Sequence, residues 1–221
     1  MINILGIPSC LHRGAKSVML MDMMRGVASS HCELNCLDIS SLPLFNPDRF
    51  MWPNHLNEVE SFRRTIHSAD ALVFSASEYP QGYAYSLTGP LKNALDWASM
   101  EPNVLVGKPA AFLGVDSLTE EGMNCYHLRQ LAIILGLDCL AEPQFCLVHD
   151  EYYNKTTGRI DEDKVDTIKH ELGKVLTALV RRHTMISSPR ARLLCQESEH
   201  FQLVNPEVRK WHVDDGFSFQ F

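Results

Sequence analysis

Short apolar runs alternate with helix-like segments along most of the chain, and this alternation restricts the fold more than any other feature. The clearest unit is residues 69–99, where the apolar run at 71–74 precedes a loop rich in Gly, Pro, Ser and Tyr. A helical pattern follows Pro90. Its apolar face is formed by Leu91, Ala94, Leu95 and Ala98. A strand buried on both faces, a long loop and a helix are typical of an open α/β sheet, whose ligands lie beyond the carboxyl ends of the strands.

The same alternation extends over the rest of the chain. The sequence predicts strands at residues 2–7, 33–39, 71–74, 108–115 and 137–148. It predicts helices at residues 16–30, 57–68, 90–99, 123–135 and 161–182. Five strands alternating with five helices predict an α/β protein, a three-layer α/β/α sandwich around a parallel sheet. Right-handed crossovers then favour the flavodoxin-like strand order 2-1-3-4-5.

Composition excludes several kinds of partner. The formal charge is −7 and no long Lys/Arg cluster is present, so nucleic acid and anionic membrane surfaces are not expected partners. No apolar run approaches the roughly 20 residues that span a bilayer. The chain starts directly with a strand pattern rather than a secretory segment, and its seven cysteines are scattered without paired spacing. We therefore expect a cytoplasmic protein with reduced structural thiols.

The character of the sequence changes near residue 184. We expect residues 1–183 to form one domain and residues 184–221 to form a C-terminal extension. Residues 187–192 are basic and rich in helix breakers, and aromatic residues alternate with polar ones near the end of the chain. Two interpretations remain open: a partly disordered tail, or an arm docked by its aromatic side chains.

Three loops converge at the carboxyl edge of the predicted sheet. The first, residues 9–17, contains the hydroxyls of Ser9 and Ser17 and the cations Arg13 and Lys16 just before a helix. Helix-end N–H groups and positive charge favour a phosphate or another anion there. An ordinary solvated loop is the alternative, because neither GxGxxG nor GxxxxGK[ST] is present.

The second loop, residues 77–89, carries Tyr79, Tyr83 and Tyr85 close to backbone amides. A flat aromatic ligand would fit against such a surface, with its polar edge bound by main-chain groups. Packing is the alternative role for these tyrosines. The third loop, residues 116–122, is polar and acidic and by itself indicates little.

Two motifs carry a resemblance to a known family. Glu78-Tyr79, followed by PLKNALDW at residues 90–97, resembles the signature PEYN…PLKNAIDW of the NAD(P)H-dependent FMN reductase and quinone reductase family. Residues 38–46 (DISSLPLFN) and 107–111 (GKPAA) match as well. Residues 126–131 (YHLRQL) are similar to the plant quinone reductase branch. The similarity runs through most of residues 1–180.

This resemblance implies a flavodoxin-like homodimer or homotetramer that holds FMN between its loops at a subunit interface. NAD(P)H reduces the flavin in that family, and a quinone, a flavin or a similar small molecule then accepts the electrons. No catalytic side chain and no metal ligand is implied. The cofactor-binding positions implied are Ser9, Cys10, His12, Arg13, Ser17, Ser77, Glu78, Tyr79, Pro80, Tyr85, Asp116 and Ser117.

The loops depart from the family pattern. Of the phosphate-loop pattern GSLRxxSxN, only Leu11 is retained, with Ser9 in place of the glycine and His12 in place of the arginine. Pro80 offers no N–H to the flavin, and the glycine-rich third loop is replaced by acidic sequence. Two functions follow: an FMN-dependent NAD(P)H oxidoreductase with altered loops, or a non-catalytic flavodoxin-like binding or scaffold protein that has lost tight FMN binding.

A third function is disfavoured. Residues 10–17 resemble the Cys-x5-Arg-Ser loop of small tyrosine phosphatases. Lys16 cannot reproduce the bidentate arginine, however, and no Asp-Pro dipeptide supplies a general acid. For the conspicuous side chains Lys92, Asn93, Asp96 and Trp97 we expect a structural role in the helix and its contacts, and for His127 and Arg129 packing or interface roles.

Overall fold

The computed structural model describes residues 1–11, 15–50, 57–77, 86–117, 123–154 and 159–189. Residues 1–183 form one compact unit. The domain division predicted near residue 184, and the role predicted for the residues after it, stay predictions because residues 190–221 lie outside the described residues.

The centre of this unit is a parallel sheet. Its strands are β1 (Ile2–Pro8), β2 (Cys32–Cys36), β3 (Ala71–Ser77), β4 (Pro109–Ser117), β5 (Asp138–Cys139) and β6 (Phe145–Val148). The order is β2-β1-β3-β4-β5, the pairings between these strands are parallel, and β6 also pairs in parallel with β4. The predicted order 2-1-3-4-5 is therefore confirmed, with a sixth strand added.

The predicted strand at residues 137–148 is two short strands. β5 pairs with the first residues of β4, whereas β6 pairs with β4 from Leu113 onward. Pro143 lies between the two strands and has no N–H for a sheet ladder. Residues 137–148 therefore form two strands, β5 and β6, which pair with different parts of β4.

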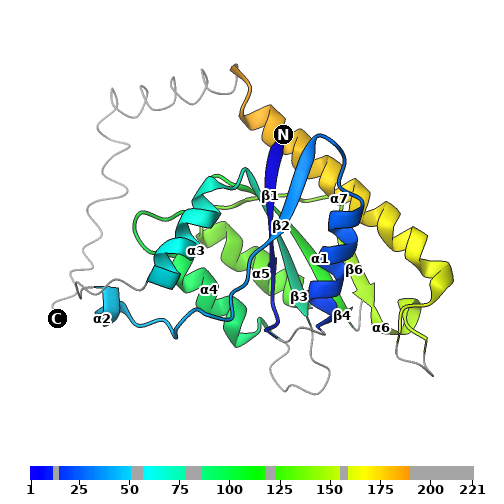
Figure 1. Cartoon of the computed structure of the whole chain (residues 1–221), viewed down its shortest axis with the longest axis horizontal. Helices are drawn as coiled ribbons and strands as arrows, with labels where there is room; N and C mark the ends of the chain where they lie inside the picture. The colour runs from blue at the N-terminus through cyan, green and yellow to red at the C-terminus, as the bar shows by residue number, and fades with distance from the viewer. Residues whose placement is uncertain (12–14, 51–56, 78–85, 118–122, 155–158, 190–221) are drawn as a thin grey trace. The chain divides into compact units, whose positions relative to one another are not determined.

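The helices cover both faces of the sheet (Figure 1). They are α1 (Lys16–Gly26), α2 (Pro47–Phe50), α3 (Asn57–Ser68), α4 (Gly89–Ser99), α5 (Met123–Ile134), α6 (His149–Tyr152) and α7 (Val165–Ile186), with the 3₁₀ turn η1 (Glu162–Lys164) before α7. α1 ends four residues before the predicted boundary, at Gly26, whose helix propensity is low. The short helices α2 and α6 were not predicted.

Two hydrophobic cores lie on opposite faces of the sheet. Along β3, Leu72, Phe74 and Ala76 pack with α3, α4 and α5, whereas the alternate residues Ala71 and Val73 pack with α1 and α7. The three-layer α/β/α sandwich is thereby confirmed. None of the described helices is long and apolar enough to cross a membrane.

The PLKNALDW stretch has a structural role in α4. Asn93 Nδ2 donates to the Pro43 carbonyl at 2.9 Å, and Phe45 N–H donates to Asn93 Oδ1 at 2.7 Å. Trp97, which is buried, donates from Nε1 to the same Pro43 carbonyl at 2.8 Å. These bonds fasten the connection between β2 and α3 to α4.

Candidate functional site

The carboxyl ends of β1, β3 and β4 meet at the lower edge of the sheet in Figure 1. The register pairs Pro8 with Ser75 and Ser77 with Val115, so the last residues of these strands lie at the same edge. The three loops of the predicted site therefore start side by side, as expected for a ligand site of an open α/β sheet.

The predicted site residues fall into three groups. Ser9, Cys10, Ser17 and Ser77 are described with their side chains, and all four are buried. Asp116 and Ser117 are described only as the last residues of β4. His12, Arg13, Glu78, Tyr79, Pro80 and Tyr85 lie outside the described residues. The structure brings together Ser9, Ser17 and Ser77, and the cofactor contacts assigned to all twelve stay predictions.

The start of α1 has the features of an anion site. Its N-cap residue is Ala15, which makes no side-chain capping bond, and the first turn contains no acidic residue. Ser17 is fully buried, and its Oγ has no hydrogen-bond partner among the described residues. The first N–H groups of a helix lack intrahelical acceptors and carry partial positive charge. A buried hydroxyl beside them fits a phosphate oxygen.

A cation is located at the same helix end. Lys16 Nζ lies 3.9 Å from the centroid of the Tyr153 ring, which is a cation–π distance. Tyr153 is buried and forms an isolated bridge with Ile160 beyond β6. The aromatic ring holds the Lys16 side chain at the start of α1, where its charge adds to that of the helix end.

The start of α4 is capped by its own sequence. Thr88 is the N-cap residue, its Oγ1 accepts from Leu91 N–H at 3.4 Å, and Pro90 stands in the first turn. The starts of α1 and α4, which both lie at this edge, therefore differ: the N-terminus of α4 is capped by Thr88, whereas α1 receives no cap from Ala15.

Hydrogen bonds join the loop ends to one another, and all of those that involve Ser77 are buried, whereas the bond from Thr88 is part-buried. Ser9 N–H donates to the Ser75 carbonyl at 3.0 Å, and Ser9 Oγ accepts from Ser77 N–H at 3.0 Å. Thr88 Oγ1 donates to the Ser9 carbonyl at 2.6 Å, and Asn124 Nδ2 donates to the Ser77 carbonyl. The N–H groups of Ser9 and Ser77 are thus engaged within the protein. A ligand would find its main-chain donors elsewhere in the loops.

Sequence reasoning missed Thr88 and Asn124. Thr88 carries a recognisable signal, because a threonine two residues before a proline that opens a helix is a common N-cap. Asn124 carries none, since its partner Ser77 is 47 residues away.

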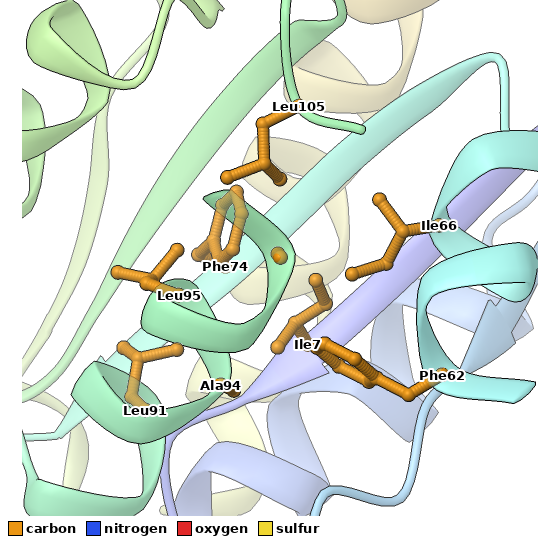
Figure 2. A pocket seen from close by; sticks show the side chains of 9 residues that line it. Ile7, Phe62, Ile66, Phe74, Leu91, Ala94, Leu95 and Leu105 are labelled. Atoms are coloured by element: carbon orange, nitrogen blue, oxygen red, sulfur yellow. The ribbon is translucent and has the colours of Figure 1, made fainter. Parts of the chain in front are cut away.

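A separate gap in the structure is not part of this site. Figure 2 shows apolar side chains of α3, α4 and the sheet pointing toward one another around it, among them Phe62, Ile66, Phe74 and Leu95. The gap has no room for a water molecule. It is an imperfection of core packing. In the described part of the chain, no group of three or more His, Cys, Asp or Glu side chains could hold a metal ion.

Comparison with known sequences identifies relatives over most of the chain. A sequence model of a family described as NADPH-dependent FMN reductase matches residues 2–151. An NAD(P)H-dependent FMN reductase of Pseudomonas aeruginosa is 33% identical over 183 residues, which cover 82% of this chain and 96% of that protein. An NAD(P)H:quinone oxidoreductase of Solanum tuberosum is 36% identical over 149 residues, 66% of this chain and 75% of that protein.

Solved structures agree on the fold. The flavoenzyme NAD(P)H:(acceptor) oxidoreductase FerB of Paracoccus denitrificans superimposes with a TM-score of 0.66 and 23% identity, covering 84% of this chain and 98% of that one. A flavodoxin of Pseudomonas aeruginosa superimposes with a TM-score of 0.54 and 13% identity, over 80% of this chain and 99% of that one. At this identity the likeness concerns architecture alone, and it agrees with the flavodoxin-like order of the strands.

Proposed function

The chain belongs to the NADPH-dependent FMN reductase family, and from this premise we propose that it is an FMN-dependent NAD(P)H oxidoreductase. Its electrons would pass to a quinone, a flavin or a similar small acceptor, in keeping with the activities for which its relatives are named. FMN, when bound, supplies the redox chemistry, since flavins accept hydride and pass electrons onward. The chain's own residues bind and orient it.

One observation supports FMN in particular: the buried Ser17 hydroxyl without a partner among the described residues, at an uncapped helix N-terminus. A polar atom buried in this way costs free energy unless a ligand satisfies it. The 5′-phosphate of FMN would accept hydrogen bonds from Ser17 Oγ and from the first N–H groups of α1. Lys16, held over Tyr153, adds positive charge beside it.

The flavin ring would then lie against the second and third loops. Glu78, Tyr79, Pro80, Tyr85, Asp116 and Ser117 are the residues proposed to surround it. His12 and Arg13 are proposed to complete the phosphate loop after Ser9 and Cys10. We also propose that the protein is cytoplasmic and that residues 184–221 form a C-terminal extension.

We also propose that the protein is a homodimer or homotetramer that associates through α5. On this helix Tyr126, Ile133 and Ile134 are 57%, 73% and 81% exposed, although all three are large and apolar. Exposed apolar side chains gathered on one helix are typical of a subunit interface. Light scattering of the wild type and of an Ile133→Lys/Ile134→Lys variant tests this. A monomeric wild type contradicts it.

The proposed activity has a direct test. The purified protein is freed of flavin and titrated with FMN, and NADPH oxidation is then followed with a quinone acceptor. We expect the fluorescence of FMN to change on binding, and we expect NADPH oxidation to require FMN. A protein that binds no FMN contradicts the proposal and supports the scaffold alternative, which is favoured by the engagement of Ser77 N–H with Ser9.

A further inference from the structure

A single hydroxyl group joins two of the loops at the candidate site. Thr88 Oγ1 donates to the carbonyl of Ser9 at 2.6 Å and accepts from Leu91 N–H at 3.4 Å. Ser9 is the first residue after β1, and Thr88 is the last residue before α4. The hydroxyl therefore ties the beginning of the first loop to the end of the second, across 79 positions of sequence.

Ser9 is in turn hydrogen-bonded to further residues of the site. Ser9 Oγ accepts from Ser77 N–H, at the beginning of the second loop, and the Ser77 carbonyl accepts from Asn124, in the first turn of α5. Ser9, Ser77 and Asn124 are 0%, 6% and 1% exposed. Buried hydrogen bonds thus connect the beginnings of the first and second loops with the start of α5.

Such bonds fix geometry because breaking one leaves a buried polar group unsatisfied. The Ser9 carbonyl would lose the Thr88 hydroxyl, and residue 9 would gain freedom to shift relative to α4. A shift of about 1 Å in a binding loop is enough to weaken ligand contacts markedly. Ser9 also stands where the family pattern has glycine, which has no hydroxyl to hold Ser77 N–H.

We infer that Thr88 is a positioning residue: its hydroxyl couples the end of the second loop, through Ser9, to the beginnings of the first and second loops, and so fixes the relative positions of the loop ends that border the proposed FMN site. This inference rests on the proposed function. Thr88 acts through Ser9 and need not touch the cofactor.

The decisive comparison is between Thr88→Val and Thr88→Ser. Valine preserves the shape but removes both hydrogen bonds, whereas serine preserves the hydroxyl. We expect Thr88→Val to raise the Kd for FMN about tenfold, equal to about 1.4 kcal/mol, because the loss of the hydrogen bond leaves the Ser9 carbonyl unsatisfied. Its bound flavin should also show an altered visible circular dichroism band. Thr88→Ser should restore both properties.

A matched control is Thr177→Val in α7, where the removed hydroxyl donates to the Gly173 carbonyl at 2.8 Å on the surface. It should leave FMN affinity and the flavin spectrum unchanged. Because Thr88→Val also removes the cap of α4, a thermal melt verifies that the variant is folded at the titration temperature.

Amide hydrogen exchange of the flavin-free protein tests the tie without the cofactor. Thr88→Val should accelerate exchange at Ser9 and Ser77, beyond the loss of protection at Leu91 that follows from the missing cap, and Thr88→Ser should not. If Thr88→Val leaves exchange at Ser9 and Ser77 unchanged, the inference is overturned. It is also overturned if exchange becomes faster while the FMN affinity and the flavin spectrum stay at their wild-type values. If the wild type binds no FMN, the proposed function fails, and the exchange rates alone decide whether the hydroxyl couples the loops.

Discussion

The amino and carboxyl ends of the sheet are held by different chemistry. At the amino end, charged side chains have fixed protein partners. Lys108 Nζ donates to the carbonyls of His67 and Ala69 at 3.0 and 2.6 Å, and Arg182 makes a two-pronged contact with Asp138 at 2.6 and 2.7 Å. At the carboxyl end, the described loop ends are joined by the neutral side chains of serine, threonine and asparagine.

The charged side chains at the amino end stabilise the fold, whereas the partial positive charge at the start of α1 is available to bind a ligand. The amino-end charges already satisfy carbonyls or each other, so they stabilise the fold and leave little for an anion. The start of α1 has no side-chain cap and no acidic residue in its first turn. Because the side chains that join the loop ends are neutral, they do not cancel the positive potential at the start of α1, which can therefore bind a phosphate.

The largest expected effect is on stability at the amino end. Arg63 donates to the carbonyls of Trp97, Met100 and Pro102 at 2.7, 3.0 and 2.7 Å. Arg63→Met leaves these carbonyls without the guanidinium, and we expect the free energy of unfolding to fall by about 3 kcal/mol. Urea denaturation measures this. Arg64→Met, at an exposed position of the same helix, should change it by less than about 0.5 kcal/mol, and an equal effect of both variants would contradict the role given to Arg63.

The next largest effect is expected at the carboxyl end, where a substitution should weaken FMN binding without lowering stability. Ser17→Ala removes a buried hydroxyl that has no partner in the described part of the chain, so the flavin-free protein should keep or slightly increase its stability. The Kd for FMN should rise about tenfold, equal to about 1.4 kcal/mol. The affinity for riboflavin, which lacks the phosphate, should not change. Ser68→Ala, on the surface of α3, serves as the control, and a destabilised variant with unchanged FMN affinity would refute the phosphate site.

A smaller loss is expected for the Arg182–Asp138 pair. Its side chains are 42% and 23% exposed, so solvent weakens the attraction. Asp138→Asn should lower the free energy of unfolding by about 1 kcal/mol in low salt, and the difference should shrink in 1 M salt as screening increases. FMN affinity should stay at the wild-type value. A change in affinity without a change in stability would contradict the separation of the two ends.

The smallest expected effect concerns pH. Burial lowers the pKa of Lys108 below its usual 10.5, and the Asp70 carboxylate opposes this only in part. The unfolded chain therefore binds more protons than the folded protein in the interval below 10.5, and the stability contribution of Lys108 rises with pH there. Urea denaturation of the wild type and Lys108→Gln from pH 8 to 10 should show the wild type gaining relative to the variant. A relative decline would mean that the Lys108 pKa is raised.

Much of the fold followed from local pattern. The alternation of apolar runs and helical faces was enough to predict the layers, the parallel sheet and its order, because burial on both faces leaves a continuous apolar run in each strand. The division of the strand predicted at residues 137–148 into β5 and β6 was missed, as were the four-residue helices α2 and α6, since such short elements have no periodicity to detect.

The site was less predictable because its bonds connect residues that are far apart in sequence. Ser9 was predicted as a ligand residue from its place in the first loop, and the structure shows that its N–H, carbonyl and hydroxyl have protein partners. Local sequence gives Thr88 a cap signal but does not reveal its bond to Ser9. The cofactor contacts of the second and third loops depend on residues 78–85 and 118–122, which lie outside the described residues.

The central claim is that the start of α1 binds the phosphate of FMN. The most direct test is a titration of the flavin-free protein with FMN and, separately, with riboflavin, following flavin fluorescence. We predict that FMN binds at least about 100-fold more tightly than riboflavin, because several charge-assisted hydrogen bonds to the phosphate are each strong. Equal affinities for the two flavins, or no binding of either, would contradict it.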